Sequence, residues 1–267
     1  YVGGVVGHAE KVNFYRVYNH NDILINGTNV QYVGGLIGYS DYFYIGYRQE
    51  TTVGNYGNIN VTSKAAQLCV GGILGYSNES TGLHWVYNVG NVKGANSSSS
   101  PAYVGGIVGV FNGNNESITY AYNYGYIQSS DYAAGILAKY ANSVDSTLNI
   151  GYSFNYGVVK AEGTRSIRAG GIYAGYEGGT DIYTTLRISN CGNEGEVSAI
   201  NNDTGTYKYN AYAGGIAAYI KGDITNCYNT GKLYVKNQQE GADKGYVGGI
   251  AGRTNGTVSQ CSMTGTM

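Results

Sequence analysis

Charged residues are scarce in this sequence, and so are the side chains that carry out most catalytic chemistry. Only 12% of the 267 residues are charged, the formal net charge is −1, and no basic run is present. A chain without a basic patch has little with which to neutralise phosphates, so we expect no nucleic-acid partner. The three histidines, His8, His20 and His84, are scattered, and none begins an H-E-x-x-H zinc motif. We therefore expect no metal site and no cofactor.

Proline and long apolar runs are scarce as well. One proline beside 44 glycines excludes a collagen triple helix, and the steady supply of Ile, Val, Leu and Tyr excludes a disordered linker. No apolar segment approaches the roughly 20 residues of a membrane-spanning helix, so we expect no membrane insertion. The sequence begins within a repeated motif, without an initiator methionine or a signal-peptide pattern. We expect it to be a segment of a longer chain.

A repeated glycine box is the most frequent feature that the sequence does contain. A Gly-Gly pair, in one copy Ala-Gly, occurs eight times at spacings of 29 to 44 residues. The residue after its second position is aliphatic in every copy: Val5, Leu36, Ile73, Ile107, Ile136, Ile172, Ile216 and Ile250. This uniformity predicts a buried column in a stacked repeat structure.

A second element, Asn-x-Gly, follows each box. Its asparagines are Asn55, Asn88, Asn123, Asn155, Asn193 and Asn229, and the outermost copies degenerate to Asn19 and Met263. We expect the glycine of this element to supply the positive φ of a tight corner. We also expect the asparagine side chains to stack as an amide ladder. The fourth residue after each asparagine is apolar, as in Ile59 and Val92, which predicts a second buried column.

Two further columns precede the asparagine. The residue five positions earlier is apolar in all copies but that of Glu50, and the residue two positions earlier is small or aliphatic, as in Val86, Ala121 and Cys191. Since these columns are an odd number of residues apart, a flat strand cannot point both inward. A bend or bulge must lie between them.

Together these columns predict an all-β fold. Three short strands per repeat cannot form a core alone, but stacked coils at a strand spacing of about 4.8 Å fuse the columns into a continuous interior. We predict a parallel β-solenoid (β-helix) of about eight coils, right-handed by the crossover rule, with residues 1–267 forming a single repeat array.

The four cysteines follow the repeat. Cys191, Cys227 and Cys261 share one column, and Cys69 stands where most glycine boxes begin with tyrosine. Parallel stacking aims the three Cβ atoms the same way, which disfavours a disulfide and favours buried free thiols. A Cys191–Cys227 or Cys227–Cys261 bond and metal binding remain the alternatives.

The sequence resembles the GLUG repeat of large bacterial surface proteins and some protist surface proteins. Gly214-Gly215-Ile216 followed by residues 226–231, and residues 248–252 leading to Cys261, carry the resemblance. It implies an extracellular or cell-surface location and a structural or interaction role as a stalk, adhesin or fibre segment, without catalysis. Its expected partners are neighbouring repeats or subunits stacked end to end, and a host or cell-surface glycan or protein.

Tyrosine, with 30 copies, suggests an alternative function. Aromatic rows can stack on sugars, so a carbohydrate-binding or carbohydrate-cleaving β-helix is the rival hypothesis, against the simpler one that the tyrosines cover a pleated surface. The column that we predict for glycan or partner contact is Tyr39, Tyr76, Tyr140, Tyr176 and Tyr219. Cleavage would require converging carboxylates, and the best pair, Glu194 and Glu196, has no matching partner in adjacent repeats.

Seven Asn-x-Ser/Thr sequons also occur. In a eukaryotic protein they would be candidate N-glycosylation sites. Their asparagines are Asn26, Asn60, Asn78, Asn96, Asn115, Asn202 and Asn255.

Overall fold

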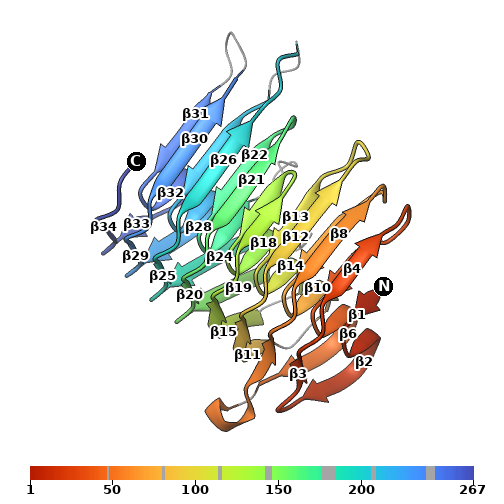
Figure 1. Ribbon diagram of the computed structural model, residues 1–267. Helices are drawn as coiled ribbons and strands as arrows, with labels where there is room; N and C mark the ends of the chain where they lie inside the picture. Colours follow the sequence, from red (N-terminus) through yellow and green to blue (C-terminus); the bar gives the residue numbers. More distant parts are fainter. Residues whose placement is uncertain are drawn as a thin grey trace.

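The protein is a rod of parallel strands stacked coil upon coil. The computed structural model describes residues 1–46, 48–79, 82–113, 116–141, 146–175, 184–205, 209–238 and 244–267. The strands lie in three parallel sheets that run the length of the rod, with the two termini at opposite ends (Figure 1). The predicted all-β parallel solenoid is confirmed.

Sheet A takes one strand from each coil, and sheet C takes one from each coil but the last. Sheet A consists of β1 (Val2–Gly3), β5 (Tyr32–Gly34), β9 (Leu68–Gly71), β13 (Ala102–Gly105), β17 (Tyr132–Ala134), β22 (Ile167–Gly170), β27 (Ala211–Gly214) and β31 (Gly245–Gly248). Sheet C consists of β4 (Ile23–Asn26), β8 (Ile59–Ser63), β12 (Val92–Asn96), β16 (Ile127–Ser129), β21 (Val159–Gly163), β26 (Val197–Asn201) and β30 (Leu233–Asn237). Eight strands in sheet A match the eight glycine boxes.

Sheet B follows the glycine box and curls around one half of each coil. Its strands before residue 113 are β2 (Val6–Phe14), β3 (Tyr18–Asn19), β6 (Ile37–Ile45), β7 (Val53–Asn55), β10 (Leu74–Asn78), β11 (Leu83–Asn88) and β14 (Val108–Asn112). The middle ones are β15 (Glu116–Asn123), β18 (Leu137–Tyr140), β19 (Ser146–Gly151), β20 (Phe154–Asn155), β23 (Tyr173–Gly175), β24 (Thr184–Ser189) and β25 (Gly192–Asn193). The last are β28 (Ala217–Thr225), β29 (Tyr228–Asn229), β32 (Ala251–Asn255), β33 (Val258–Ser259) and β34 (Ser262–Met263).

Helix is nearly absent from the described part of the chain. It consists of the single 3-10 turn η1 (Gln49–Thr51), in the second coil. Within the described residues, no helix has the length and hydropathy that crossing a bilayer would require.

The register of the strands superposes the predicted columns. The backbone N–H of Ile216 donates to the carbonyl of Ile250 in the next coil at 2.9 Å. From Leu36 to Ile216 this column is fully buried, whereas Val5 is 46% exposed and Ile250 is half-buried because each lies in a terminal coil. The predicted interior column is therefore confirmed, with both its ends open.

The interior has two large apolar cores that meet at a narrow waist, and a smaller third cluster surrounds Cys69, Tyr103 and Tyr132. One core lies inside the curl of sheet B, and the other lies between sheets A and C. At the waist, the asparagine side chains form the predicted amide ladder. For example, Asn88 Nδ2 donates to Asn123 Oδ1 at 2.9 Å, and Asn123 Nδ2 donates to Asn155 Oδ1 at 2.8 Å. The same nitrogens donate to the carbonyl two residues onward, as from Asn123 to Gly125 at 2.9 Å.

The expected role of the glycine after each asparagine is wrong. The described glycines with positive φ are Gly46, Gly82 and Gly222, none of which belongs to an Asn-x-Gly element. Instead, a Cβ added to Gly90 would lie 2.0 Å from the carbonyl oxygen of Gly57 in the preceding coil. Glycine is required there because successive coils approach too closely for any side chain.

The predicted bend between the two odd-spaced columns is confirmed. It occurs at a single residue with positive φ, three positions before the asparagine and directly before the column of small or aliphatic residues. Trp85, Tyr120 and Tyr152 occupy this position in three successive coils, with φ values of 53, 54 and 51°. In the second coil, η1 takes its place.

Replacing Gly106 of a glycine box by Ala is expected to destabilise the fold. The new Cβ would lie 2.1 Å from the Gly135 carbonyl oxygen and 2.6 Å from Asn123 Cγ, and neither atom can move without separating two coils. Overpacking of this kind costs about 1–3 kcal/mol, measurable by denaturant unfolding. Gly151→Ala is the control, since its nearest neighbour is 3.7 Å away. Equal losses for both variants would contradict the close approach at the waist.

Candidate functional site

Two columns of side chains face each other where sheet A turns into sheet B, and they contain most of the predicted contact tyrosines. Tyr39 and Tyr76 are in register on sheet B. Their rings are parallel within 7° at 5.7 Å. Tyr32 from sheet A stacks on Tyr76 at 4.7 Å, and Tyr1 stacks on Tyr39 at 4.7 Å. The rings therefore cover one another's faces.

Tyr140 does not belong to this column, so the predicted grouping of five tyrosines is wrong. Lys139, not Tyr140, is in register with Val110 and hence with Tyr76. Tyr140 is only 6% exposed. It packs in the sheet B core, and its hydroxyl shares a 2.8 Å hydrogen bond with Ser146 Oγ. Tyr176 lies outside the described residues. A one-residue difference in spacing after the glycine box therefore turns the Tyr140 side chain inward.

Cations complete the column farther along the rod. Tyr219 is half-buried, and the guanidinium groups of Arg168 and Arg253 lie 5.4 and 4.8 Å from its ring centroid. The ammonium group of Lys139 lies 4.6 Å from the centre of the Tyr103 ring. These contacts place cations on ring faces that a sugar would otherwise use.

Hydrogen bonding and burial fix the charge state of the exposed end of the column. Burial, together with the neighbouring Asp41, raises the pKa of Tyr39 to about 12. The phenol is therefore neutral at physiological pH, and its hydroxyl donates to Asp41 Oδ1 at 3.1 Å. Burial opposes ionisation of Asp41, but hydrogen bonds from Asn78 and His8 outweigh it and lower the pKa of the carboxyl. The Tyr39 hydroxyl is thus engaged within the protein.

The predicted sequons differ in accessibility. Asn78 and Asn202 are half-buried and donate to carboxylates of neighbouring coils at 2.7 and 3.1 Å. Asn96 is 5% exposed and donates to a backbone carbonyl at 3.0 Å. Asn115 lies outside the described residues. The sequon asparagines that are exposed to solvent are Asn26, Asn60 and Asn255.

All four cysteines are free thiols, and for Cys191, Cys227 and Cys261 this is what their parallel stacking predicts. Cys69, Cys191 and Cys227 are buried and Cys261 is half-buried. The Cys191 sulfur donates to the backbone carbonyl of Ser189 at 3.2 Å. Burial raises the pKa of the Cys191 thiol, so it is an unreactive core side chain.

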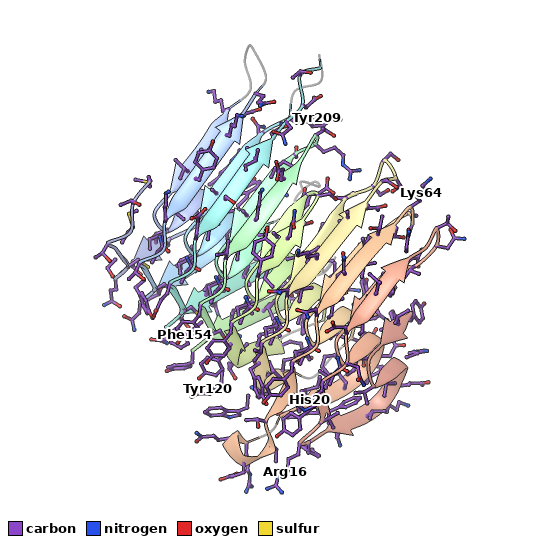
Figure 2. The ribbon with its side chains drawn as sticks, viewed as in Figure 1. Arg16, His20, Lys64, Tyr120, Phe154 and Tyr209 are labelled. Atoms are coloured by element: carbon purple, nitrogen blue, oxygen red, sulfur yellow. The ribbon has the colours of Figure 1, made fainter. Side chains whose placement is uncertain are left out.

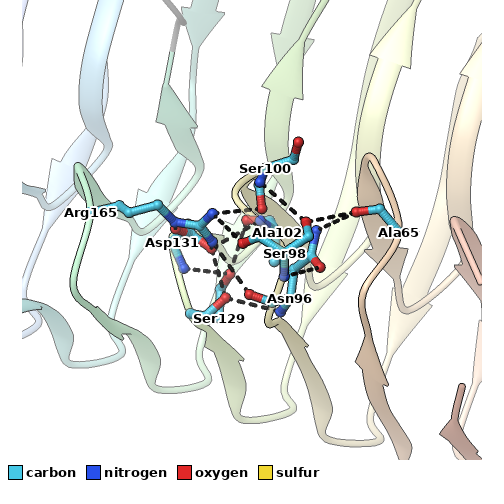
Figure 3. Close-up of polar contacts among 9 residues, drawn as sticks. Ala65, Asn96, Ser98, Ser100, Ala102, Ser129, Asp131 and Arg165 are labelled. Atoms are coloured by element: carbon cyan, nitrogen blue, oxygen red, sulfur yellow. Dashed lines mark hydrogen bonds and ion pairs between the residues drawn. The ribbon is translucent and has the colours of Figure 1, made fainter. Parts of the chain in front are cut away.

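A buried ion pair ties three loops together on the side where sheet C leads to sheet A (Figure 3). The Arg165 guanidinium binds both carboxylate oxygens of Asp131, at 2.7 and 2.8 Å. It also donates to the carbonyls of Ser98 and Ser100 at 2.8 Å and of Asn96 at 3.4 Å. The carboxylate is only 1% exposed. Because these bonds use all five guanidinium hydrogens, this cluster has a structural role.

Polar clefts of 310 and 400 Å³ flank Arg165 and share Ser99 and Tyr209 in their walls. The Arg165 side chain lines both clefts. Besides Arg165, their walls contain hydroxyl groups of serine, threonine and tyrosine and the side chain of Arg168.

Glu10 and Asp41 of neighbouring coils are in register on sheet B, and Asp41 is bound by His8. Glu194 and Glu196 are exposed, and Glu194 accepts a 2.8 Å hydrogen bond from the Tyr228 hydroxyl. Burial raises the pKa of Glu116 to about 7, but the neighbour in register with it is the apolar Leu148. Among the described residues, no three His, Cys, Asp or Glu side chains are placed to hold a metal ion.

The residues at the positive-φ bend form a partly exposed aromatic surface that was not predicted from the sequence. Trp85 and Tyr120 stack at 4.1 Å and 1°, and Tyr120 and Tyr152 stack at 5.3 Å and 12°. Such pairs contribute about 0.5–1.5 kcal/mol each, whereas a non-glycine residue with positive φ costs about 1–3 kcal/mol. The sequence does contain a signal for this ladder, since an aromatic residue stands three positions before the asparagine in three successive repeats.

A second ladder lies beside the first, at the position directly after the asparagine. Tyr124 and Tyr156 stack at 5.0 Å and 8° and are 52% and 39% exposed. Figure 2 shows Tyr120 and Phe154 directed outward at this edge of the rod. Phe154 lies beside the second ladder, with its ring 6.5 Å from that of Tyr156. The two ladders and Phe154 form one surface, the aromatic corner, which consists of Trp85, Tyr120, Tyr152, Phe154, Tyr124 and Tyr156.

No protein-family model, curated protein or solved structure matches the chain at a significant level.

Proposed function

We propose that the chain is an extracellular structural repeat array, a stalk, adhesin or fibre segment without catalysis of its own. The observation that carries this proposal is the parallel pairing of coil with coil in all three sheets, in which the ladders at the waist and in the aromatic columns serve coil-to-coil contacts. The GLUG-like motifs supply the expected cell-surface location. When the polar and aromatic groups of each coil bind the next coil, the array can form a long, stiff rod.

Further coils, of the same chain or of a second subunit, are the proposed partners at the two ends. The edge strands β1 and β31 each pair with only one neighbour among the described strands. Val5 at one end and Val258 at the other are 46% and 42% exposed. An open strand edge with apolar side chains beside it is a template for a further parallel coil.

The isolated chain is therefore expected to associate end to end as its concentration rises. Sedimentation velocity and negative-stain microscopy would show lengthening rods. The double variant Val5→Lys/Ile250→Lys should remain monomeric, because it places a charge in each terminal core column. Leu24→Lys is the control, since Leu24 is 79% exposed. A wild-type segment that stays monomeric at all concentrations would contradict end-to-end stacking.

Carbohydrate binding is the second candidate function. The partly exposed aromatic corner favours it. Tyr39 and Tyr76 are a poorer sugar platform, because both are half-buried and the Tyr39 hydroxyl is already bound to Asp41.

A further inference from the structure

The aromatic corner has side chains that its backbone does not require. Two later coils place Asn190 and Asn226 at the same bend, with φ values of 55 and 52°. Asparagine tolerates this left-handed conformation better than a bulky ring does. Trp85, Tyr120 and Tyr152 therefore strain the backbone where an amide would relieve it, which indicates that the rings themselves have a use.

The chemistry of the aromatic corner favours an uncharged ligand rich in hydroxyl groups. None of its six side chains is charged, and the Tyr152, Tyr124 and Tyr156 rings are 48%, 52% and 39% exposed. Along the rod, the first ladder continues into a pair of amides, where Asn226 Nδ2 donates to Asn190 Oδ1 at 2.6 Å. The second ladder continues into the exposed carboxylate of Glu194, which would repel an acidic polymer. Rings beside amides and phenols suit a neutral sugar, whereas an acidic polymer would need cations.

The spacing of the rings distinguishes among extended polymers. The ring centroids within the two ladders are 4.1, 5.3 and 5.0 Å apart along the rod. An extended peptide repeats on one face every 6.6–6.8 Å or about two residues, and stacked nucleotides advance by about 3.4 Å. One coil advances along the rod by about 4.8 Å, the spacing of paired strands. One pyranose unit of an extended polysaccharide advances by nearly the same distance.

We propose that the aromatic corner binds a neutral linear polysaccharide that lies parallel to the rod axis. Successive sugar units would contact the edges and hydroxyls of successive rings, since the ring faces are used within the ladders. This proposal does not depend on end-to-end assembly, because the corner lies on the side of the rod.

Affinity electrophoresis of the full chain tests the proposal, with hydroxyethyl cellulose, β-1,3-glucan, xylan and galactomannan as the probes. We expect at least one polysaccharide to retard the wild-type protein. The triple variant Trp85→Asn/Tyr120→Asn/Tyr152→Asn should bind on the order of tenfold more weakly, equivalent to about 1.4 kcal/mol. Asparagine keeps the bend, so thermal unfolding should show that this variant remains folded.

Tyr42→Asn is the matched control. Tyr42 is also exposed, at 50%, and also has a positive φ of 49°, but it lies outside the aromatic corner. Its variant should bind like the wild type, and a second variant, Tyr124→Ser/Tyr156→Ser, should bind more weakly. No retardation by any of the four probes, or full binding by the triple variant, would overturn the proposal. So would a change of oligomeric state in the triple variant, because it would assign the corner to a second copy of the chain.

Discussion

Replacing Arg165 by Met is expected to lower the free energy of unfolding by about 3–5 kcal/mol, the usual cost of breaking a buried ion pair from one side. The Asp131 carboxylate, 1% exposed, would keep only its bonds from the Ala102 N–H at 3.0 Å and the Ser130 hydroxyl at 2.6 Å. The carbonyls of Ser98 and Ser100 would also lose their donor. Denaturant unfolding monitored by circular dichroism would measure the loss.

Two further variants separate this effect from a general loss of charge. Lys160→Met removes a pair to Glu162 whose side chains are 30% and 32% exposed, so we expect a change below about 1 kcal/mol. Asp131→Leu/Arg165→Met removes both charges at once. It should be more stable than Arg165→Met alone, because no buried charge is left uncompensated. A double variant that is less stable than the single one would refute this account of the Arg165–Asp131 cluster.

The sequence predicts the fold well because the same physical requirement recurs in every coil. An aliphatic residue after the glycine box and an asparagine at the waist each have to satisfy the neighbour above and the neighbour below. Ile216 lies over Ile250, and Asn88 lies over Asn123, as their columns require. Repetition thus reports three-dimensional contacts that a single motif does not.

The role of glycine was not predictable in the same way. Both a positive φ and a close approach exclude a Cβ, so the sequence alone does not tell the two apart. At Gly90 the limiting contact is the Gly57 carbonyl oxygen, which lies 2.0 Å from the point that a Cβ would occupy, and this distance is set by the neighbouring coil.

The candidate site was harder to predict because its residues vary between coils. Tyr140 lies one residue farther from its glycine box than Tyr76 does, and this difference moves it from the surface into the core. The ladder of Trp85 and Tyr120 was missed because its position also accepts asparagine. Arg165 pairs with Asp131 through loops of unequal length, which leave no periodic signal.

Asn123→Ala is expected to destabilise the protein by at least about 3 kcal/mol, since it removes a rung from the middle of the buried ladder. Asn88 Nδ2, Asn155 Oδ1 and the Gly125 carbonyl would each lose a hydrogen bond. Each such buried group costs about 1–3 kcal/mol when it is left without its partner. Equilibrium unfolding in guanidinium chloride would measure the loss.

The effect should exceed that of an ordinary asparagine because the rung joins two interfaces at once. In a stacked array, stability is close to a sum over coils and their nearest-neighbour contacts. Asn123→Ala weakens the contacts of its coil with both neighbours, so the unfolding transition should broaden as the two halves of the rod uncouple. Asn149→Ala, at an exposed position in β19, should change stability by less than about 0.5 kcal/mol. If both variants unfolded alike, the amide ladder would add nothing beyond what water provides, and the coils would be held together by their apolar columns alone.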